Sequence, residues 1–269
     1  MTSLLLKTLG TLLVVGLLTA YVRGWRHLRR LGHRPRAWRL AAYTLGMATI
    51  AVAVLALDEL ADERFSAHMI QHLLLVMLAA PLVELGDPLP LVLWGLPRSA
   101  RAAMAATLRP GGAVRRTLTA LTALPVAGAV YVVTMWAWHV PALYDAAAEH
   151  ELLHALEHTM FFISALLFWW PVLQPAPRLH PRVQPGLQIA YLVAATAQNT
   201  ALGMILRIPD RAFYPHYVRE AAAHGLDPID DQALGGGLMW SMGHMYLAPI
   251  LVILYAFARR AEREDVPPF

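Results

Sequence analysis

The chain has 269 residues, of which 58% are hydrophobic and only 15% are charged, with a formal net charge of +4. Soluble domains carry about 25% charged residues, so the composition, with several long apolar runs, excludes an ordinary soluble protein and predicts a polytopic membrane protein. The absence of cysteine excludes disulfides, thiolate metal sites and iron–sulfur clusters, and leaves histidine, methionine and carboxylates as metal ligands. The excess of arginine indicates membrane topology, and no nucleic-acid partner is expected.

Apolar segments of spanning length recur along the whole chain and predict an all-α, polytopic transmembrane helix bundle. We expect seven spans within a single integral membrane domain, residues 1–269, at about 3–22, 40–57, 66–85, 118–138, 151–173, 186–206 and 233–258. Residues 88–108 are too interrupted by proline to span and predict an interfacial or re-entrant piece. The connection 207–232 is polar, with a short surface helix expected around 217–224.

The basic residues are distributed unevenly between the two sides of the predicted bundle. Segments 23–39, 86–117 and 174–185, together with the tail after residue 258, hold 17 of the 22 basic residues. Loops rich in arginine and lysine stay in the cytoplasm. The distribution therefore predicts an outer N-terminus and a cytoplasmic C-terminus.

Histidines occur at helical spacing near the predicted outer ends of two spans. The stretch HELLHALEHTMFF places His150, His154 and His158 four residues apart, and the third span carries His68 and His72 at the same spacing. Residues four apart share one face of a helix. Two such pairs at matching depth predict that the imidazoles meet across the bundle.

Further candidate ligands lie at the same predicted level. His139 ends the fourth span, and the seventh span carries Met242 and His244. Ionisable groups inside a membrane are costly and mark functional sites, and imidazole with thioether suits copper, especially Cu(I). The predicted metal ligands are His68, His72, His139, His154, His158, His244 and Met242.

Other interpretations of these residues remain open at this point. A single membrane histidine is commonly a hydrogen-bonding core residue, and methionine is a common apolar filler. Glu157 is predicted either to orient a neighbouring histidine or to face a polar cavity. Asp230 and Asp231 form part of an acidic outer rim that attracts cations, or simply an acidic outer loop.

Four stretches, in this order, resemble the multi-pass cytochrome c oxidase assembly factor family, CtaG of the Bacillus caa-type oxidase kind. They are HMIQHLLL (68–75), WHVPALYDAA (138–147), LHALEHTMFFISALLFWWP (153–171) and DQALGGGLMW (231–240). The likeness covers about residues 40–258. It implies a role in maturing a haem–copper oxidase, with copper delivered from the periplasmic side. It further implies functional positions at His68, His72, His139, His154, His158, Gly235, Gly236, Met239 and Trp240.

The leading hypothesis is therefore a non-enzymatic membrane assembly factor. It would bind copper at an outer-leaflet His/Met site and pass it by ligand exchange to a cytochrome c oxidase subunit, after loading from a periplasmic copper donor. Its other partner is the lipid bilayer.

Three alternatives were weighed against this hypothesis. A copper transporter is disfavoured because the inner half of the spans lacks histidines or acid pairs apart from Glu84. A haem-binding or di-metal oxidoreductase is disfavoured because only Glu157 is well placed among the acids. A metal-free assembly scaffold would use its histidines only to hold helices together.

Overall fold

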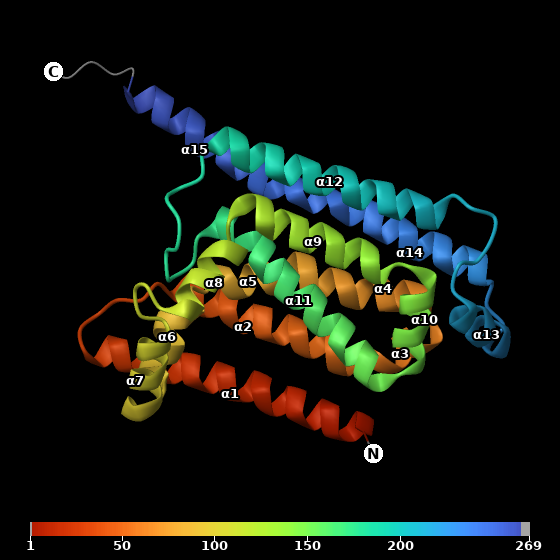
Figure 1. Ribbon diagram of the computed structural model, residues 1–269, viewed down its shortest axis with the longest axis horizontal. Coiled ribbons are helices and arrows are strands. Elements are labelled where there is room, and N and C mark those ends of the chain that lie inside the picture. Colours follow the sequence, from red (N-terminus) through yellow and green to blue (C-terminus); the bar gives the residue numbers. More distant parts are fainter. Residues whose placement is uncertain (1, 265–269) are drawn as a thin grey trace.

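The chain folds into a bundle of long helices lying side by side, as the computed structural model shows for residues 2–264 (Figure 1). No strand occurs within that range. The long helices are α1 (Thr2–Arg30), α2 (Ala37–Ala51), α9 (Leu124–Trp138), α11 (Glu151–Leu173), α12 (Pro185–Arg207), α14 (Pro228–Gly243) and α15 (Leu247–Glu264). The third span is built from α4 (Phe65–Leu73), the π-helical η2 (Leu74–Ala79) and α5 (Ala80–Leu85). The shorter elements are η1 (Val52–Ala56), α3 (Asp58–Glu63), α6 (Pro88–Gly95), α7 (Arg98–Thr107), α8 (Ala113–Leu121), α10 (Pro141–Glu149), α13 (Pro215–His224) and η3 (His244–Tyr246).

Six helical segments between residues 2 and 264 are long and apolar enough to cross a membrane, and a bent pair of helices raises the number to seven. This confirms the predicted all-α polytopic bundle. The orientation of the termini and the division into one domain stay predictions. The last span begins at Pro228, five residues before the predicted 233, because its acidic first turn is already helical.

The fourth span differs from its prediction. Residues 118–138 were expected to form one helix, but α8 ends at Leu121, α9 begins at Leu124, and the two are bent by 72°. Proline has no N–H to donate and its ring clashes with the carbonyl four residues earlier. Pro125 therefore cannot continue a helix through Leu121. The straight part of the predicted span is therefore α9 alone, which has 15 residues.

The segment predicted to be interfacial or re-entrant forms two short helices, α6 and α7. Neither belongs to the candidate spans. Helix α6 packs tightly on α1, since a Cβ atom added at Gly24 would lie 1.7 Å from the carbonyl oxygen of Leu91. In Figure 1, α6 and α7 lie at the end of the bundle opposite α3, α10 and α13.

The π-helical turn η2 gives the third span a free carbonyl. In a π-helix the carbonyl of Val76 would accept from the residue five positions later, which is Pro81 and has no N–H. The indole Nε1 of Trp169 donates to this oxygen at 3.0 Å. The bond ties α11 to the third span, and these two elements carry the paired histidines.

The surface helix expected around 217–224 is present as α13, from Pro215 to His224. It lies with α3 and α10 at one end of the bundle (Figure 1). Tyr217 of α13 is buried. The helix therefore covers the end of the bundle where α4 and α11 begin.

Helices α12 and α14 approach closely through glycines. A Cβ atom at Gly236 would lie 2.7 Å from the backbone nitrogen of Arg207 and from the carbonyl oxygen of Gly203. Small residues at such contacts let helix backbones pack against each other in membranes. Gly236, the middle residue of the GGG sequence, is therefore needed for the close packing of α14 on α12.

We expect Gly236→Ala to destabilise the protein by about 1–3 kcal/mol, because the added methyl overlaps rigid backbone atoms. Thermal unfolding in mild detergent measures this. Gly237→Ala is the matched control, since its Cβ atom would meet only the Arg207 side chain, at 3.4 Å. Equal stability of the two variants would contradict the packing described for α12 and α14.

Candidate metal centre

The histidine-bearing helix α4 begins with a cap supplied by α14. The backbone N–H of Phe65 donates to Oδ2 of Asp231 at 2.7 Å, and that of Ser66 donates to Oδ1 at 3.3 Å. The Ser66 hydroxyl bonds to the same carboxylate. A carboxylate at this position satisfies N–H groups that have no partner within the helix. Asp231 is therefore a helix cap that sets the start of α4, rather than a free member of an acidic rim.

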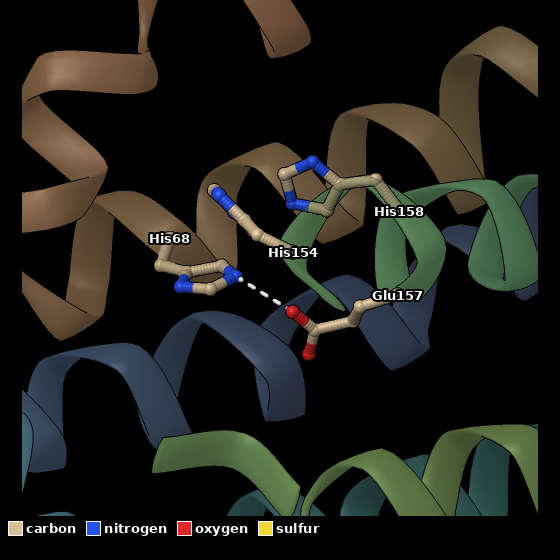
Figure 2. A group of neighbouring side chains, drawn as sticks. All are labelled: His68, His154, Glu157 and His158. Carbon is tan, nitrogen blue, oxygen red and sulfur yellow. Dashed lines mark ion pairs between the residues drawn. The ribbon is translucent and has the colours of Figure 1, made fainter. Parts of the chain in front are cut away.

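Four side chains from α4 and α11 converge beside this cap. Ligand atoms of His68, His154, Glu157 and His158 all lie within 4.8 Å of one another. Figure 2 shows the two α11 histidines beside each other, with Glu157 from the same helix directed at His68. The rings of His154 and His158 have centroids 4.2 Å apart, and those of His68 and His154 are 4.8 Å apart. The predicted meeting of two His pairs therefore occurs.

Two further predicted histidines extend the cluster into the bundle. The ring centroid of His72 is 4.4 Å from that of His68 and 5.1 Å from that of His158. His139, at the end of α9, is 6.1 Å from His72 by the same measure. The Nε2 atoms of all five rings are buried and have no hydrogen-bond partner within the described chain: His68, His72, His139, His154 and His158.

Glu157 occupies the middle of this group. Its side chain is fully buried, and its carboxylate oxygens lie 3.4 Å from Nε2 of His68 and 3.6 Å from Nε2 of His72. Neither oxygen accepts a hydrogen bond from the residues described. The sequence indicated Glu157 as an orienting residue or a lining of a polar cavity, but the structure makes its carboxylate a ligand candidate itself. The signal was its position three residues after His154, on nearly the same helix face.

Hydrogen bonds assign the tautomer of His68. The hydroxyl of Tyr217 donates to the carbonyl of Ala61 at 2.8 Å and lies 2.6 Å from Nδ1 of His68. Burial raises the pKa of the Tyr217 hydroxyl, so it keeps its single proton. Because that proton is given to Ala61, the hydroxyl accepts from Nδ1–H of His68. The Nε2 lone pair of His68 is then free and faces Glu157, as in metal-ligating histidines held by a neighbouring group.

His139 is held in the same tautomer by the backbone. Its Nδ1 lies 2.6 Å from the carbonyl oxygen of Met135, which can only accept, so Nδ1 carries the proton. Its Nε2 is left with a lone pair in the protein interior. Tyr217 and Met135 were not indicated as site residues by the sequence, because their contacts join segments whose pairing the sequence does not reveal.

The remaining histidines and the methionine considered from the sequence are His244, His150 and Met242. His244, a predicted ligand, is exposed and its Nδ1 lies 3.1 Å from the Ser241 carbonyl, apart from the cluster. His150 is also exposed, at the N-terminal boundary of α11. The side chain of Met242 lies outside the described residues. The structure thus brings together five of the seven predicted ligands and adds Glu157.

The donor set fits a transition-metal ion. Imidazole nitrogens and a carboxylate bind Cu(II), Zn(II) or Fe(II), and none of the hard ions prefers three imidazoles. Ligand atoms on opposite sides of one ion stand about 4.2 Å apart at most. The widest pair here is 4.8 Å apart, so small side-chain rotations bring the set to bonding distance.

Comparison with known proteins assigns the chain to a family. The family model described as cytochrome c oxidase caa3 assembly factor matches residues 19–261. The chain belongs to the cytochrome c oxidase caa3 assembly factor family. The matched residues include every helix that contributes to the histidine cluster, and the resemblance found in the motifs is confirmed.

Similar proteins add little about this family's chemistry. An uncharacterized protein of Mycobacterium bovis and one of Mycobacterium tuberculosis are each 26% identical over 273 residues, covering 97% of this chain. An uncharacterized protein of Mycobacterium leprae is 25% identical over 267 residues, covering 95%. The chain spans only 39% of the length of the first two and 38% of the third. No solved structure matches the chain significantly.

We expect Asp231→Ala to lower the free energy of unfolding by about 1–2 kcal/mol, since the cap of α4 is lost. Thermal unfolding in detergent checks this. The adjacent Asp230 is exposed, so Asp230→Ala is the matched control and should change little. If Asp230→Ala were the more destabilising variant, Asp231 would not be the cap.

We expect Tyr217→Phe to weaken metal binding at the cluster by about 10–100-fold, because the His68 ring loses the group that orients it. Isothermal titration with Cu(II) in detergent measures the affinity. Tyr191→Phe is the control, since the Tyr191 hydroxyl donates instead to the Phe168 carbonyl, at 3.1 Å. Unchanged affinity in Tyr217→Phe would contradict the tautomer assigned to His68.

Proposed function

We propose that this assembly factor binds copper at the cluster of His68, His154, Glu157 and His158 and delivers it to a subunit of a cytochrome c oxidase. Membership of the oxidase assembly family supports the client. The observation that supports metal binding is the convergence of three imidazoles and a carboxylate in one buried group. The protein would act by ligand exchange and would make or break no covalent bond of a substrate.

We favour copper for two reasons, which are the ligand types of the cluster and the expected oxidase client. The cluster alone accepts Cu(II), Zn(II) or Fe(II). The expected client is a haem–copper oxidase, so copper is the transition metal that an assembly factor with this site would carry. The chain has no cysteine, so thiolate transfer, the route of many soluble copper carriers, is not open to it.

The location of the cluster supports delivery at the outer face of the bacterial inner membrane. The cluster lies where α4 and α11 begin and α9 ends, at the end of the bundle that also carries α3, α10 and α13 (Figure 1). The arginine distribution predicts that this end faces the periplasm. A periplasmic copper donor and the oxidase subunit would then reach the site from the same side.

Copper content after purification tests the proposal. The protein would be purified in mild detergent from copper-supplemented cells, and copper, iron and zinc quantified by mass spectrometry. We expect about one copper or more per chain and at least a tenfold loss in the double variant His68→Ala/His158→Ala, because two buried ligands are removed. Oxidase activity in cells that carry the double variant should fall in parallel.

The control variant is His150→Ala/His244→Ala, which removes two exposed histidines. It should retain copper, and loss of copper there would restore His244 as a ligand. A Soret absorbance band in the wild-type protein would favour a haem protein instead. Full oxidase activity and oxidase copper content with His68→Ala/His158→Ala would refute copper delivery from this cluster and leave a metal-free scaffold.

A further inference from the structure

Next to the cluster, deeper in the bundle, lies a small cavity of about 10 Å³, room for a single water or ion. Residues of α4, η2, α9, α12 and α14 line it, with α12 contributing Asn199. Its lining includes four methionines and two of the five clustered histidines: Met69, Met77, Met135, Met239, His72 and His139.

All four methionine side chains are buried, with exposed fractions between 0% and 4%. They come from four separate elements, so their arrangement around one cavity is a product of the fold and not of a local sequence repeat. Met77 and Met135 reach the cavity through the packing of η2 and α9, which the sequence pattern alone does not reveal.

The histidines of the cavity have unused nitrogen lone pairs. Nδ1 of His139 is occupied by the Met135 carbonyl, so its Nε2 lone pair is free, and both ring nitrogens of His72 lack a hydrogen-bond partner among the described residues. Buried polar atoms normally have partners. Methionine alone in this cavity would indicate simple packing, but methionine together with unpartnered imidazoles resembles a set of metal ligands.

The chemistry of this lining is softer than that of the outer cluster. No carboxylate or other charged side chain lines the cavity in the described structure. Thioethers and imidazoles are neutral ligands that favour Cu(I) over harder divalent ions. A monovalent ion also costs less to bury than a divalent ion where no counter-charge is present.

We propose that this cavity is a second metal site, which takes Cu(I) with thioether and imidazole ligands. The inference deepens the proposed function and rests on it for its biological role. His72 lies between the two sites, because its Nε2 is 3.6 Å from Glu157 of the outer cluster while its ring lines the inner cavity. An ion that stays in the Cu(I) state would then move between the sites with His72 as a bridging ligand.

The experiment is anaerobic titration of the full-length protein in detergent with Cu(I), against a competing chelator, followed by copper K-edge absorption spectroscopy. The test variant is Met135→Leu/Met239→Leu, with each single variant measured as well. Leucine is close to methionine in volume and preserves core packing. The matched control is Met160→Leu/Met204→Leu, two methionines that are each 39% exposed.

We expect wild-type protein and the control to bind two Cu(I) ions, with sulfur among the copper neighbours. The test variant should bind the second Cu(I) ion at least tenfold more weakly and show a smaller sulfur contribution, because only Met69 and Met77 remain to supply sulfur, and the single variants should weaken binding of the second ion to a smaller extent. Circular dichroism and thermal unfolding confirm that the variants are folded. Retention in the test variant of both ions and of the sulfur contribution would overturn the second site.

A third variant, His68→Ala/His154→Ala, separates failure of this inference from failure of the proposed function. Binding of copper through nitrogen and oxygen alone, lost in this variant and unchanged by Met135→Leu/Met239→Leu, would overturn the inner site and keep the outer one. Loss of one ion and survival of sulfur-ligated Cu(I) in the histidine variant is the result that both proposals predict. Binding of two ions by the histidine variant would overturn copper binding at the outer cluster and keep the inner site. Absence of any copper binding would overturn both.

Discussion

The candidate site depends on the burial of the Glu157 carboxyl group against the imidazole rings of His68 and His72. With Nδ1 protonated, Nε2 of His68 presents a lone pair to the carboxyl group of Glu157 at 3.4 Å, and neither group has a hydrogen-bond partner at these atoms among the described residues. An unsatisfied buried acceptor costs about 1–3 kcal/mol, and a charged one costs more. A proton or a metal ion between these atoms would offset that cost. The other contacts of the bundle therefore hold together a group of buried polar atoms that a bound cation would stabilise.

Those other contacts come from segments far apart in the chain. Asp231 of α14 caps α4, Trp169 of α11 bonds to the carbonyl that Pro81 leaves free in the third span, and Tyr217 of α13 bridges Ala61 and His68. Each bond positions an element that carries a ligand. The candidate ligands thus sit on helices whose ends and faces are fixed by neighbours, an arrangement that would keep metal ligands in place.

Periodicity and charge explain how much of this the sequence predicts. Spacing by four residues places His68 with His72 and His154 with His158 on single faces, and span boundaries give their depth, so their meeting was predictable. The depth of a residue in the membrane does not give the direction of its side chain. For this reason His244 was predicted as a ligand although its side chain is exposed. The central position of Glu157 depends on how α4 faces α11, and single-helix patterns do not contain that information. Pro125 was visible in the sequence, yet the apolar run across 118–138 outweighed it in the prediction of the fourth span.

A metal-delivery protein must hold an ion firmly enough to accept it and loosely enough to release it. Full release of an ion inside the bundle would leave it without ligands in a medium of low dielectric constant, which is costly. Two ligand sets with His72 between them would avoid this state, because ligands would be exchanged one at a time while the ion stays coordinated. Imidazoles compete for the metal with protons, whereas thioethers do not. The inner set, in which thioethers replace part of the imidazoles, would therefore lose less affinity under acidic conditions than the outer set.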